Sequence, residues 1–579
     1  MRNFRPTAYV LFFLILSIFI KAQYQPIGQD TTDKLKAEQW VEQTYQSLSM
    51  DERLGQLFIV ALYNNKGPEH IEAVRSLVEN EKIGGLILMQ DDAAVHIEEL
   101  NRMHQSLKIP LLVGMDAEWG LYQRIRSAQK LPWAITLGAI QDKQLISEMA
   151  SQIARDAKKT GVYWNFAPVV DVNTNPSNPI IGNRSFGSSV QNVVASARAY
   201  AQGLQREGVL AAIKHFPGHG DTSTDSHHDL PVVDHPLSRL EAVELAPFKQ
   251  MLSDGVGGVM IAHLYVPALE KSSGVPASLS HSIITGLLKE KYGYKGLIIT
   301  DALNMGAVAK RYAPGEVDYL AFKAGNDIML FSDGVKEGKE KILRAIASGE
   351  IPEKRLEESV KKILRTKYDL GLTSFTPLST EGIATAFDSS SHRALNEKLY
   401  LSALTLLKDE KNLLPLDCTK EYYHLPLEEA PHEDFSLALS TYTTPKKVSS
   451  TQALALEEPS TIIVSLHKDN STAYKPFTIS KESKALLEKL KRKHQIVLLL
   501  FGSPYGLKDM DLDGISTVLV AYENNPFAMR AAAKSLSGYH PITGKLPVQV
   551  RPGLEEGAGT DFYPTTNPNT PSAQGGATH

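Results

Sequence analysis

The segment 214–231, KHFPGHGDTSTDSHHDLP, concentrates side chains that could do chemistry. It holds four histidines, three aspartates and a lysine, and it follows the apolar run Val209–Ile213. A helical pattern resumes near Leu237. A long polar loop between a buried strand and a helix is typical of a functional site. Metal binding, acid–base catalysis and the binding of a polar ligand would each suit these residues.

The spacing of Asp225 and His227 favours acid–base chemistry. The two residues are separated by one position, so in an extended segment their side chains lie on the same side. A turn could place the carboxylate on one imidazole nitrogen. This would fix the tautomer and leave the other nitrogen free to give and take a proton.

Further polar residues follow other apolar runs. Asp301 comes directly after LIIT, where it could serve as a carboxylate nucleophile or, alternatively, cap the next helix. Hydrogen-bond donors for hydroxyls or a carbonyl are available from Lys214, His215, Arg124 and Arg184, unless these are solvated surface charges. The remaining polar residues after such runs are Asp116, Glu118, Asn165, Asp171 and His263.

Several other chemistries are disfavoured. The His-rich segment could supply metal ligands, but the chain has no HExxH motif, so we predict neither a metal nor a cofactor. GxSxG is also absent, and GHG is not a P-loop. A nucleophilic carboxylate with a proton donor is the logic of retaining glycoside hydrolysis, here with an Asp–His pair in place of the second carboxylic acid.

The elements that must position these residues form a repeating pattern of a buried apolar run, a polar loop and a helix. Continuous apolar runs are typical of parallel strands buried on both faces. Eight such runs with helices between them predict an α/β fold, a (β/α)8 TIM-type barrel, with the polar residues at the strand ends where such barrels hold their active sites. A doubly wound sheet is the alternative, but no GxGxxG follows the first run. The runs are 56–62, 85–89, 110–115, 162–167, 209–213, 257–261, 296–300 and 327–331.

The chain is too long for one core. We predict a signal peptide over 1–22, a catalytic barrel over 23–371, a linker over 372–389, a smaller α/β sandwich domain over 390–553 and a disordered tail over 554–579. Strands are expected at 461–466, 496–501, 517–522 and 546–550, and helices at 392–407, 481–493 and 526–536.

Composition, charge and the N-terminal residues indicate which partners the protein lacks and where it acts. The net charge of −4 gives no electrostatic footprint for nucleic acid. Arg2 and Arg5 precede an apolar run from Ala8 to Ile20, which predicts cleavage after Ala22, export to the periplasm or medium, and no stable membrane insertion afterwards. An uncleaved anchor is the alternative. The single cysteine, Cys418, excludes an intramolecular disulfide. No pattern in the sequence specifies an oligomeric state.

Three motifs resemble glycoside hydrolase family 3. They are GNRSFG (182–187), the segment 214–231 and TDALNM (300–305), and the resemblance extends over about 48–370. The DSH triplet within 214–231 is similar to the β-N-acetylglucosaminidase branch of the family. SALTLLKDEKNLLPL (402–416) and TGKLPV (543–548) resemble the family's α/β sandwich domain.

The resemblance implies roles for individual residues. It makes Asp301 the nucleophile, His227 the acid/base and Asp225 the partner that orients His227. It also implies that N-acetylglucosamine is bound by Asp116, Arg124, Arg184, Lys214 and His215. The family's usual DQEGGR reads DAEWGL here, with Trp119 and Leu121 in place of Gly and Arg. Arg124 is expected to replace the missing arginine, and Trp119 to alter what binds beyond the first sugar.

The leading hypothesis is an exported, retaining exo-β-N-acetylglucosaminidase that acts on peptidoglycan or related fragments. The alternatives are a β-glucosidase or xylosidase of the same family, a phosphorylase, and a non-catalytic saccharide-binding protein on the same barrel. The His acid/base would not repel phosphate as a carboxylate does, which keeps the phosphorylase open. The DSH triplet argues against an acid/base on the second domain, which we expect to be mainly structural.

Overall fold

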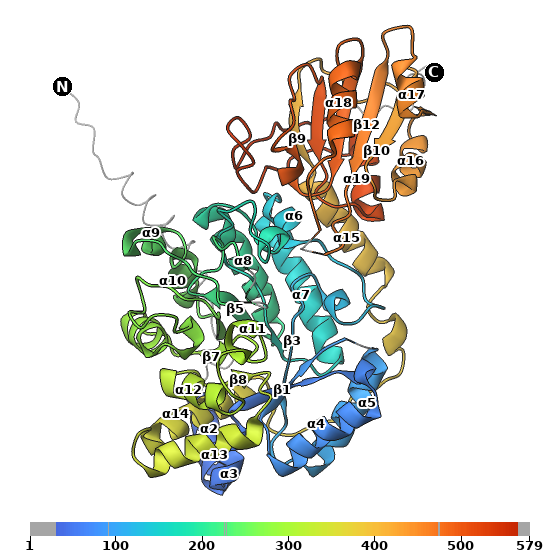
Figure 1. The fold of residues 1–579 in the computed structure, drawn as a ribbon. Coiled ribbons are helices and arrows are strands. Elements are labelled where there is room, and N and C mark those ends of the chain that lie inside the picture. Colours follow the sequence, from blue (N-terminus) through green and yellow to red (C-terminus); the bar gives the residue numbers. More distant parts are fainter. Residues whose placement is uncertain (1–30, 91, 225, 227–228, 473–474, 565–579) are drawn as a thin grey trace, which may run out of the picture.

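The computed structural model describes residues 31–90, 92–224, 226, 229–472 and 475–564 (Figure 1). The predicted signal peptide, Asp225, His227 and the last part of the predicted tail, 565–579, lie outside these residues. In the described ranges, no helix has the length and apolar character needed to cross a membrane.

The first sheet is an eight-stranded parallel barrel. Its strands are hydrogen-bonded in the order β7-β6-β5-β4-β3-β2-β1-β8. A parallel bridge between Ile299 and Ile328 brings the two ends of this order together, so the barrel is nearly closed. The strands are β1 (Phe58–Leu62), β2 (Gly85–Leu88), β3 (Leu112–Met115), β4 (Trp164–Asn165), β5 (Leu210–Phe216), β6 (Gly258–Ile261), β7 (Leu297–Thr300) and β8 (Met329–Leu330).

Each of the eight predicted apolar runs overlaps a barrel strand, which confirms the predicted fold. Seven of the eight strands are buried at every residue, and β5 is buried from its second residue on. This explains why the runs do not alternate between apolar and polar residues. β5 is the exception in length: it continues past the apolar run, so Lys214 and His215 belong to the strand and not to the loop that follows.

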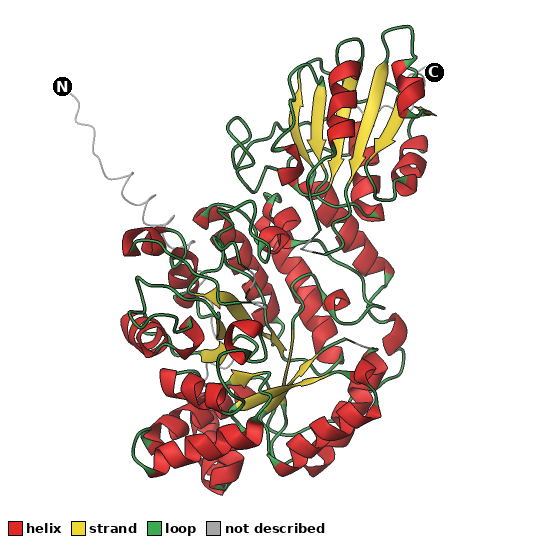
Figure 2. Cartoon of the chain, in the orientation of Figure 1, coloured by secondary structure: helices red, strands yellow, loops and turns green. Residues whose placement is uncertain are grey.

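Helices surround the barrel (Figures 1 and 2). They are α2 (Thr31–Ser47), α3 (Met50–Gly55), α4 (Pro68–Asn80), α5 (Ala93–Met103), α6 (Ala134–Gly138), α7 (Lys143–Lys159), α8 (Val190–Arg206), α9 (Leu237–Ala242), α10 (Ala246–Leu252), α11 (Gly306–Ala309), α12 (Glu316–Ala324), α13 (Val335–Ala347) and α14 (Glu353–Asp369). A π-helical segment, η6 (Ser282–Lys291), precedes β7. Short 3-10 turns are η1 (Asn64–Lys66), η2 (His104–Ser106), η3 (Leu121–Gln123), η4 (Gly182–Arg184), η5 (Ala277–Leu279), η7 (Ile383–Thr385) and η8 (Pro504–Leu507).

The second sheet is mixed and has six strands in the order β11-β10-β12-β13-β14-β9, of which β9 is antiparallel. Helices cover both faces, because neighbouring residues of β12, Ile462 and Ile463, belong to two different apolar clusters. The strands are β9 (Thr405–Asp409), β10 (Tyr423–Leu427), β11 (Lys446–Lys447), β12 (Thr461–His467), β13 (Gln495–Phe501) and β14 (Thr517–Val520); the helices are α15 (Ser390–Ala403), α16 (Glu433–Ser440), α17 (Ser450–Leu454), α18 (Lys481–Leu490) and α19 (Pro526–Leu536).

Three expectations for this part of the chain are wrong in detail. The helix predicted to reach residue 407 ends at Ala403, because the residues from Thr405 on pair with β14. Residues 546–550 form no strand of the described sheets. The predicted disordered tail begins too early, because Phe562 pairs with Ile542 in an antiparallel bridge. Composition alone does not indicate such a backbone contact.

Candidate active site

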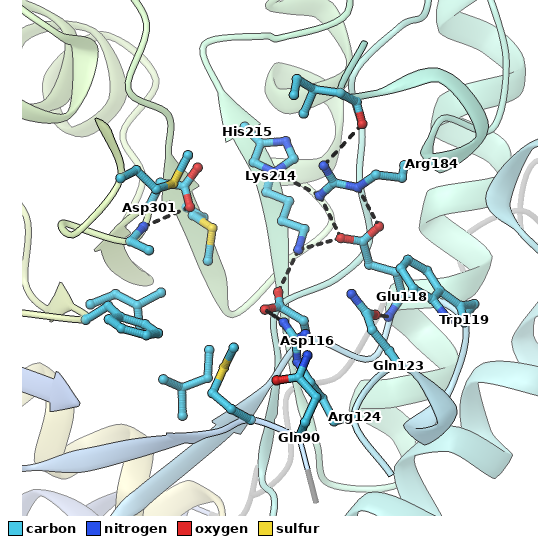
Figure 3. A pocket seen from close by; sticks show the side chains of 18 of the residues that line it. Gln90, Asp116, Glu118, Trp119, Gln123, Arg124, Arg184, Lys214, His215 and Asp301 are labelled. Atoms are coloured by element: carbon cyan, nitrogen blue, oxygen red, sulfur yellow. Dashed lines mark hydrogen bonds and ion pairs between the residues drawn. The ribbon is translucent and has the colours of Figure 1, made fainter. Parts of the chain in front are cut away.

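A cavity of about 490 Å³ opens at the C-terminal ends of the barrel strands (Figure 3). Six predicted site residues line it together, although they come from four different strand–loop connections: Asp116, Arg124, Arg184, Lys214, His215 and Asp301. Ser226, which the sequence places between Asp225 and His227, lines the same cavity. The predicted acid/base His227 and its partner Asp225 lie outside the described residues.

A register irregularity in β5 directs two consecutive residues into the cavity. The pairing of β5 with β6 shifts between Ile213 and Phe216, and the residues between them are Lys214 and His215. In a regular strand these two side chains would point to opposite faces. The irregularity allows both to line the cavity, as bulges beside active sites commonly do.

Lys214 is the centre of an ion-pair network (Figure 3). Its ammonium lies 2.9 Å from Oδ1 of Asp116 and 2.8 Å from Oε1 of Glu118. Each carboxylate also binds an arginine. The Arg124 Nη2 atom is 2.6 Å from Asp116, and Arg184 donates to both oxygens of Glu118 at 2.9 and 2.7 Å. Such bidentate contacts fix the orientation of a guanidinium group.

The network keeps its carboxylates ionised. Burial raises the pKa of Glu118, but the charges of Arg184 and Lys214 outweigh it and lower the pKa to about 2. The pKa of Asp116 is also well below its usual value, because Lys214 and Arg124 overcome the cost of burial. Conversely, burial lowers the pKa of Lys214, and the two carboxylates raise it above the ordinary lysine value.

A buried aspartate orients the histidines. Asp171 Oδ2 lies 2.7 Å from Nδ1 of the His215 ring, and its Oδ1 accepts a hydrogen bond from the backbone N–H of His219 at 2.7 Å. The Nε2 of His215 faces Arg184 Nη2 at 3.3 Å. The two ring nitrogens of His215 therefore contact Asp171 and Arg184, and these contacts fix the orientation of the ring. Asp171 was noted in the sequence but not chosen as a site residue, because only the fold brings it to His215.

Two glycines shape the start of the loop after β5, and for different reasons. Gly218 has a φ of +129°, a conformation that residues with a side chain rarely adopt. At Gly220 a Cβ would lie 1.9 Å from the carbonyl oxygen of Val172, so only glycine fits. The side chain of Asn178 donates to the carbonyls of His219 and Gly220 and anchors this turn.

Asp301 projects from the end of β7 into the cavity. It does not cap a helix, because α11 begins only at Gly306 with Met305 as its N-cap. One carboxylate oxygen accepts a hydrogen bond from Ala302 N at 2.8 Å. Burial raises the pKa of Asp301, but His215, His263 and the Ala302 N–H together lower it by more. The pKa therefore lies below its ordinary value.

Two of the polar residues noted at strand ends support the site from behind. Asn165 bonds the backbone of Ala117 in both directions, at 3.0 and 3.2 Å, and so holds the segment after β3. His263 contacts Ser278 Oγ at 2.7 Å and the Ala302 carbonyl at 3.0 Å. The fold thus separates side chains that face the cavity from side chains that fix its walls.

The described histidines do not assemble a metal site in the cavity, because both ring nitrogens of His215 already have protein partners. Among the described residues, Asp221, His235 and Glu244 lie close enough to share a cation. Arg239 lies 3.9 Å from Asp221 and 3.1 Å from Glu244, and its charge opposes a metal ion there.

The second sheet contributes to the cavity, which the sequence did not predict. Ser471 and Thr472, from the segment after β12, line it together with Trp119 and Trp133 of the barrel. No motif marks Ser471 or Thr472, since their position depends on how the two sheets pack. The expectation that the second domain is mainly structural is therefore incomplete.

A (β/α)8 barrel whose strand ends carry a carboxylate nucleophile candidate beside a buried network of charged side chains is an arrangement that suits a glycoside hydrolase. Residues 49–366 match the model of the glycosyl hydrolase family 3 N terminal domain. The chain belongs to this family and is a glycoside hydrolase.

Individual relatives agree with this assignment. The chain is 31% identical over 420 residues to a β-hexosaminidase A of Pseudoalteromonas piscicida, covering 66% of this chain and 69% of the relative. It is 29% identical over 392 residues to a β-N-acetylglucosaminidase/β-glucosidase of Cellulomonas fimi, covering 66% and 68%. A solved family 3 β-N-acetylglucosaminidase from Paenibacillus sp. str. FPU-7 superposes with a TM-score of 0.72 at 30% identity, covering 87% of this chain and 99% of that one.

Proposed function

We propose that the protein is an exported, retaining exo-β-N-acetylglucosaminidase that removes terminal β-linked N-acetylglucosamine from peptidoglycan or related fragments. The observation that carries this proposal is the convergence of Asp301 and the network of Lys214, Asp116 and Glu118 on one cavity. Relatives of this chain that are named β-hexosaminidases support N-acetylglucosamine as the sugar.

In the first step the Asp301 carboxylate attacks C1 of the sugar, and the bond from C1 to the leaving oxygen breaks. His227 gives its proton to that oxygen, and a covalent glycosyl-enzyme forms. In the second step water attacks C1 while His227 accepts a proton from it. The sugar leaves with retained configuration, and Asp301 is regenerated.

Two other candidates for the acid/base, Glu118 and His219, are poor proton donors at neutral pH. Glu118 has a pKa of about 2 and is bound to Arg184 through both oxygens. Burial and the neighbouring His215 lower the pKa of His219 to about 4, and its Nδ1 is bound to Thr222. A general acid works best when its pKa lies near the working pH. Neither Glu118 nor His219 meets this condition, which supports His227 as the acid/base.

A panel of nitrophenyl glycosides tests the activity. We expect the N-acetylglucosaminide to give the highest kcat/KM, above the glucoside and the xyloside, with no requirement for phosphate. Preference for the glucoside or xyloside would make the protein a β-glucosidase or xylosidase. A phosphate-dependent sugar 1-phosphate would make it a phosphorylase, and binding without turnover would make it a saccharide-binding protein.

Export and the natural substrate have separate tests. Expression in a Gram-negative host with sequencing of the mature N-terminus should give Gln23, whereas retention of residues 1–22 would contradict export by cleavage. Digestion of soluble peptidoglycan fragments should release free N-acetylglucosamine as the first product. Internal cleavage without free N-acetylglucosamine would contradict exo action.

A further inference from the structure

The active-site cavity has a floor and a rim built by different parts of the chain. Its floor includes Ile87, Met260 and Leu330, which are buried residues of β2, β6 and β8. Its rim includes Ser471 and Thr472 of the second sheet's connection, which are exposed. An enzyme that removes a terminal sugar holds that sugar at the floor, so the next unit of the substrate must lie at the rim.

Trp119 lies on the side of the cavity that meets the second sheet. It is partly exposed, lines the cavity, and its ring centroid is 4.1 Å from that of Trp133 at an interplanar angle of 49°. Trp133 is 1% exposed, so it acts as the buried backing of a pair whose outer member, Trp119, faces the cavity. Such a pair presents a rigid aromatic surface.

The second sheet holds this pair in place. The Trp133 backbone N–H donates to the Glu523 carboxylate at 2.8 Å, and its indole N–H donates to the Asn470 carbonyl at 3.1 Å. Asn470 directly precedes Ser471 and Thr472 in the chain. One short segment therefore fixes the aromatic pair and supplies two hydroxyl side chains beside it.

We propose that Trp119, together with Ser471 and Thr472, forms a subsite for the sugar ring attached to the N-acetylglucosamine unit that is removed. The C–H groups on one face of a pyranose can pack against the electron-rich face of the Trp119 indole. The hydroxyls of the sugar can form hydrogen bonds with the hydroxyls of Ser471 and Thr472. The subsite rests on the proposed function, because it takes the removed unit to be the terminal one. It makes the second domain a determinant of which leaving group is accepted.

The test compares two substrates whose leaving groups are both alcohols. Methyl β-N-acetylglucosaminide has no ring in its leaving group, and N,N′-diacetylchitobiose has one. For Trp119→Ala we expect kcat/KM on the disaccharide to fall about tenfold, as loss of a stacking contact would cause, and kcat/KM on the methyl glycoside to stay within about twofold. Trp119→Phe should keep the disaccharide within about threefold of wild type.

Trp40→Ala is the matched control, because Trp40 packs on Tyr368 of α14 and does not line the cavity. It should leave the ratio of the two kcat/KM values unchanged. Equal losses on both substrates with Trp119→Ala, or no loss on either, would overturn the subsite. If Trp119→Ala does not fold, the double variant Ser471→Ala, Thr472→Ala decides: a selective loss on the disaccharide supports the subsite, and an unchanged ratio overturns it.

The same experiment separates this inference from the proposed function. Wild-type enzyme that hydrolyses neither substrate would refute the activity itself. Wild-type enzyme that hydrolyses both, with a ratio that no rim variant alters, would refute only the subsite.

Discussion

Lys214 connects the charges of the cavity. Its ammonium bonds Asp116 and Glu118, and each of these carboxylates bonds an arginine, so three cations face two carboxylates. Among the described residues, Asp301 is the third carboxylate that lines this cavity, and Lys214 contributes to the lowering of its pKa. The arrangement therefore favours Asp301 as an anion, the form that a nucleophile requires.

Asp301→Asn tests the nucleophile. The replacement is nearly isosteric and lies at the barrel rim, so the thermal unfolding midpoint should stay close to that of wild type. Loss of the attacking carboxylate should lower kcat by several orders of magnitude. Measurement of kcat on the nitrophenyl N-acetylglucosaminide, with circular dichroism as the folding control, checks this. A folded variant with near-normal turnover would contradict the role of Asp301.

The pH dependence of wild-type kcat/KM follows from the same carboxylate. Because the pKa of Asp301 is lowered, the nucleophile stays ionised at pH values where an ordinary aspartate, with a pKa of about 3.9, would begin to protonate. Activity should therefore persist as pH falls and be lost only on passing through the lowered pKa. A limb that depends on Asp301 and lies above pH 5 in a protein that is still folded would contradict this prediction.

His227→Ala tests the acid/base. Cleavage of sugar–sugar bonds should nearly cease, because alcohol leaving groups need a proton. With a nitrophenolate leaving group the first step should survive, so a burst of product should precede slow turnover. Azide, a nucleophile that needs no base, should restore turnover and yield the β-glycosyl azide. Asp225→Ala should behave similarly but more mildly, and equal losses without burst or rescue would limit His227 to binding.

At the scale of elements, the segment between β3 and α6 carries much of the site and is held at both ends. Near its start, Tyr200 of α8 donates to the carbonyls of Ala117 and Glu118 at 2.8 and 3.1 Å. Near its end, Glu523 of the second sheet accepts from Trp133 N and from Thr136 Oγ1, both at 2.8 Å. The packing of the two sheets thus influences the position of the substrate-facing residues between these anchors.

Glu523→Ala should loosen this segment. Glu523 is 0% exposed, so its removal leaves the Trp133 N–H and the Thr136 hydroxyl without their buried acceptor, at a cost of roughly 1–3 kcal/mol for each such group. We expect a lower unfolding midpoint and a raised KM for N,N′-diacetylchitobiose. Glu482→Ala, at an exposed position of α18, is the control and should change neither quantity. Unchanged stability in Glu523→Ala would mean that the contact between the sheets does not depend on this carboxylate.

At the scale of the whole molecule, α14 carries a buried lysine that is bound only to neutral acceptors in the described contacts. Lys367 is 0% exposed and donates to Gln56 Oε1 at 2.8 Å and to the Gly84 carbonyl at 2.9 Å. Burial lowers the pKa of Lys367 to about 7. The unfolded chain has the ordinary value of about 10.4, so between these two values it binds one more proton than the folded protein.

This lysine should therefore make the protein more stable as pH rises from about 7 toward 10. Relative to Lys367→Met, which does not titrate, wild type should gain on the order of 2 kcal/mol in unfolding free energy between pH 6 and pH 9. Denaturant unfolding of both proteins at the two pH values measures this gain, and the common background of other titrating groups cancels in the difference. A pH-independent difference between them would show that Lys367 stays charged or neutral throughout.

The sequence determined the barrel and much of its site. Strands buried on both faces leave continuous apolar runs, and the rule that barrel sites lie at the C-terminal strand ends then brought Asp116, Lys214 and Asp301 to one place. The motif around 214–231 pointed to the chemistry, because it places several titratable side chains directly after one buried apolar run. These features depend on local pattern, which is why the sequence alone carries them.

The tertiary structure decided what depends on contacts between distant segments. Glu118 pairs with Arg184, 66 positions away, and Asp171 contacts His215, 44 positions away. Ser471 enters the cavity from several hundred positions beyond the first barrel strands. The irregularity that turns both Lys214 and His215 inward depends on the neighbouring strand β6. Such contacts arise from packing geometry, and no local pattern of residue types encodes which distant side chain will complete them.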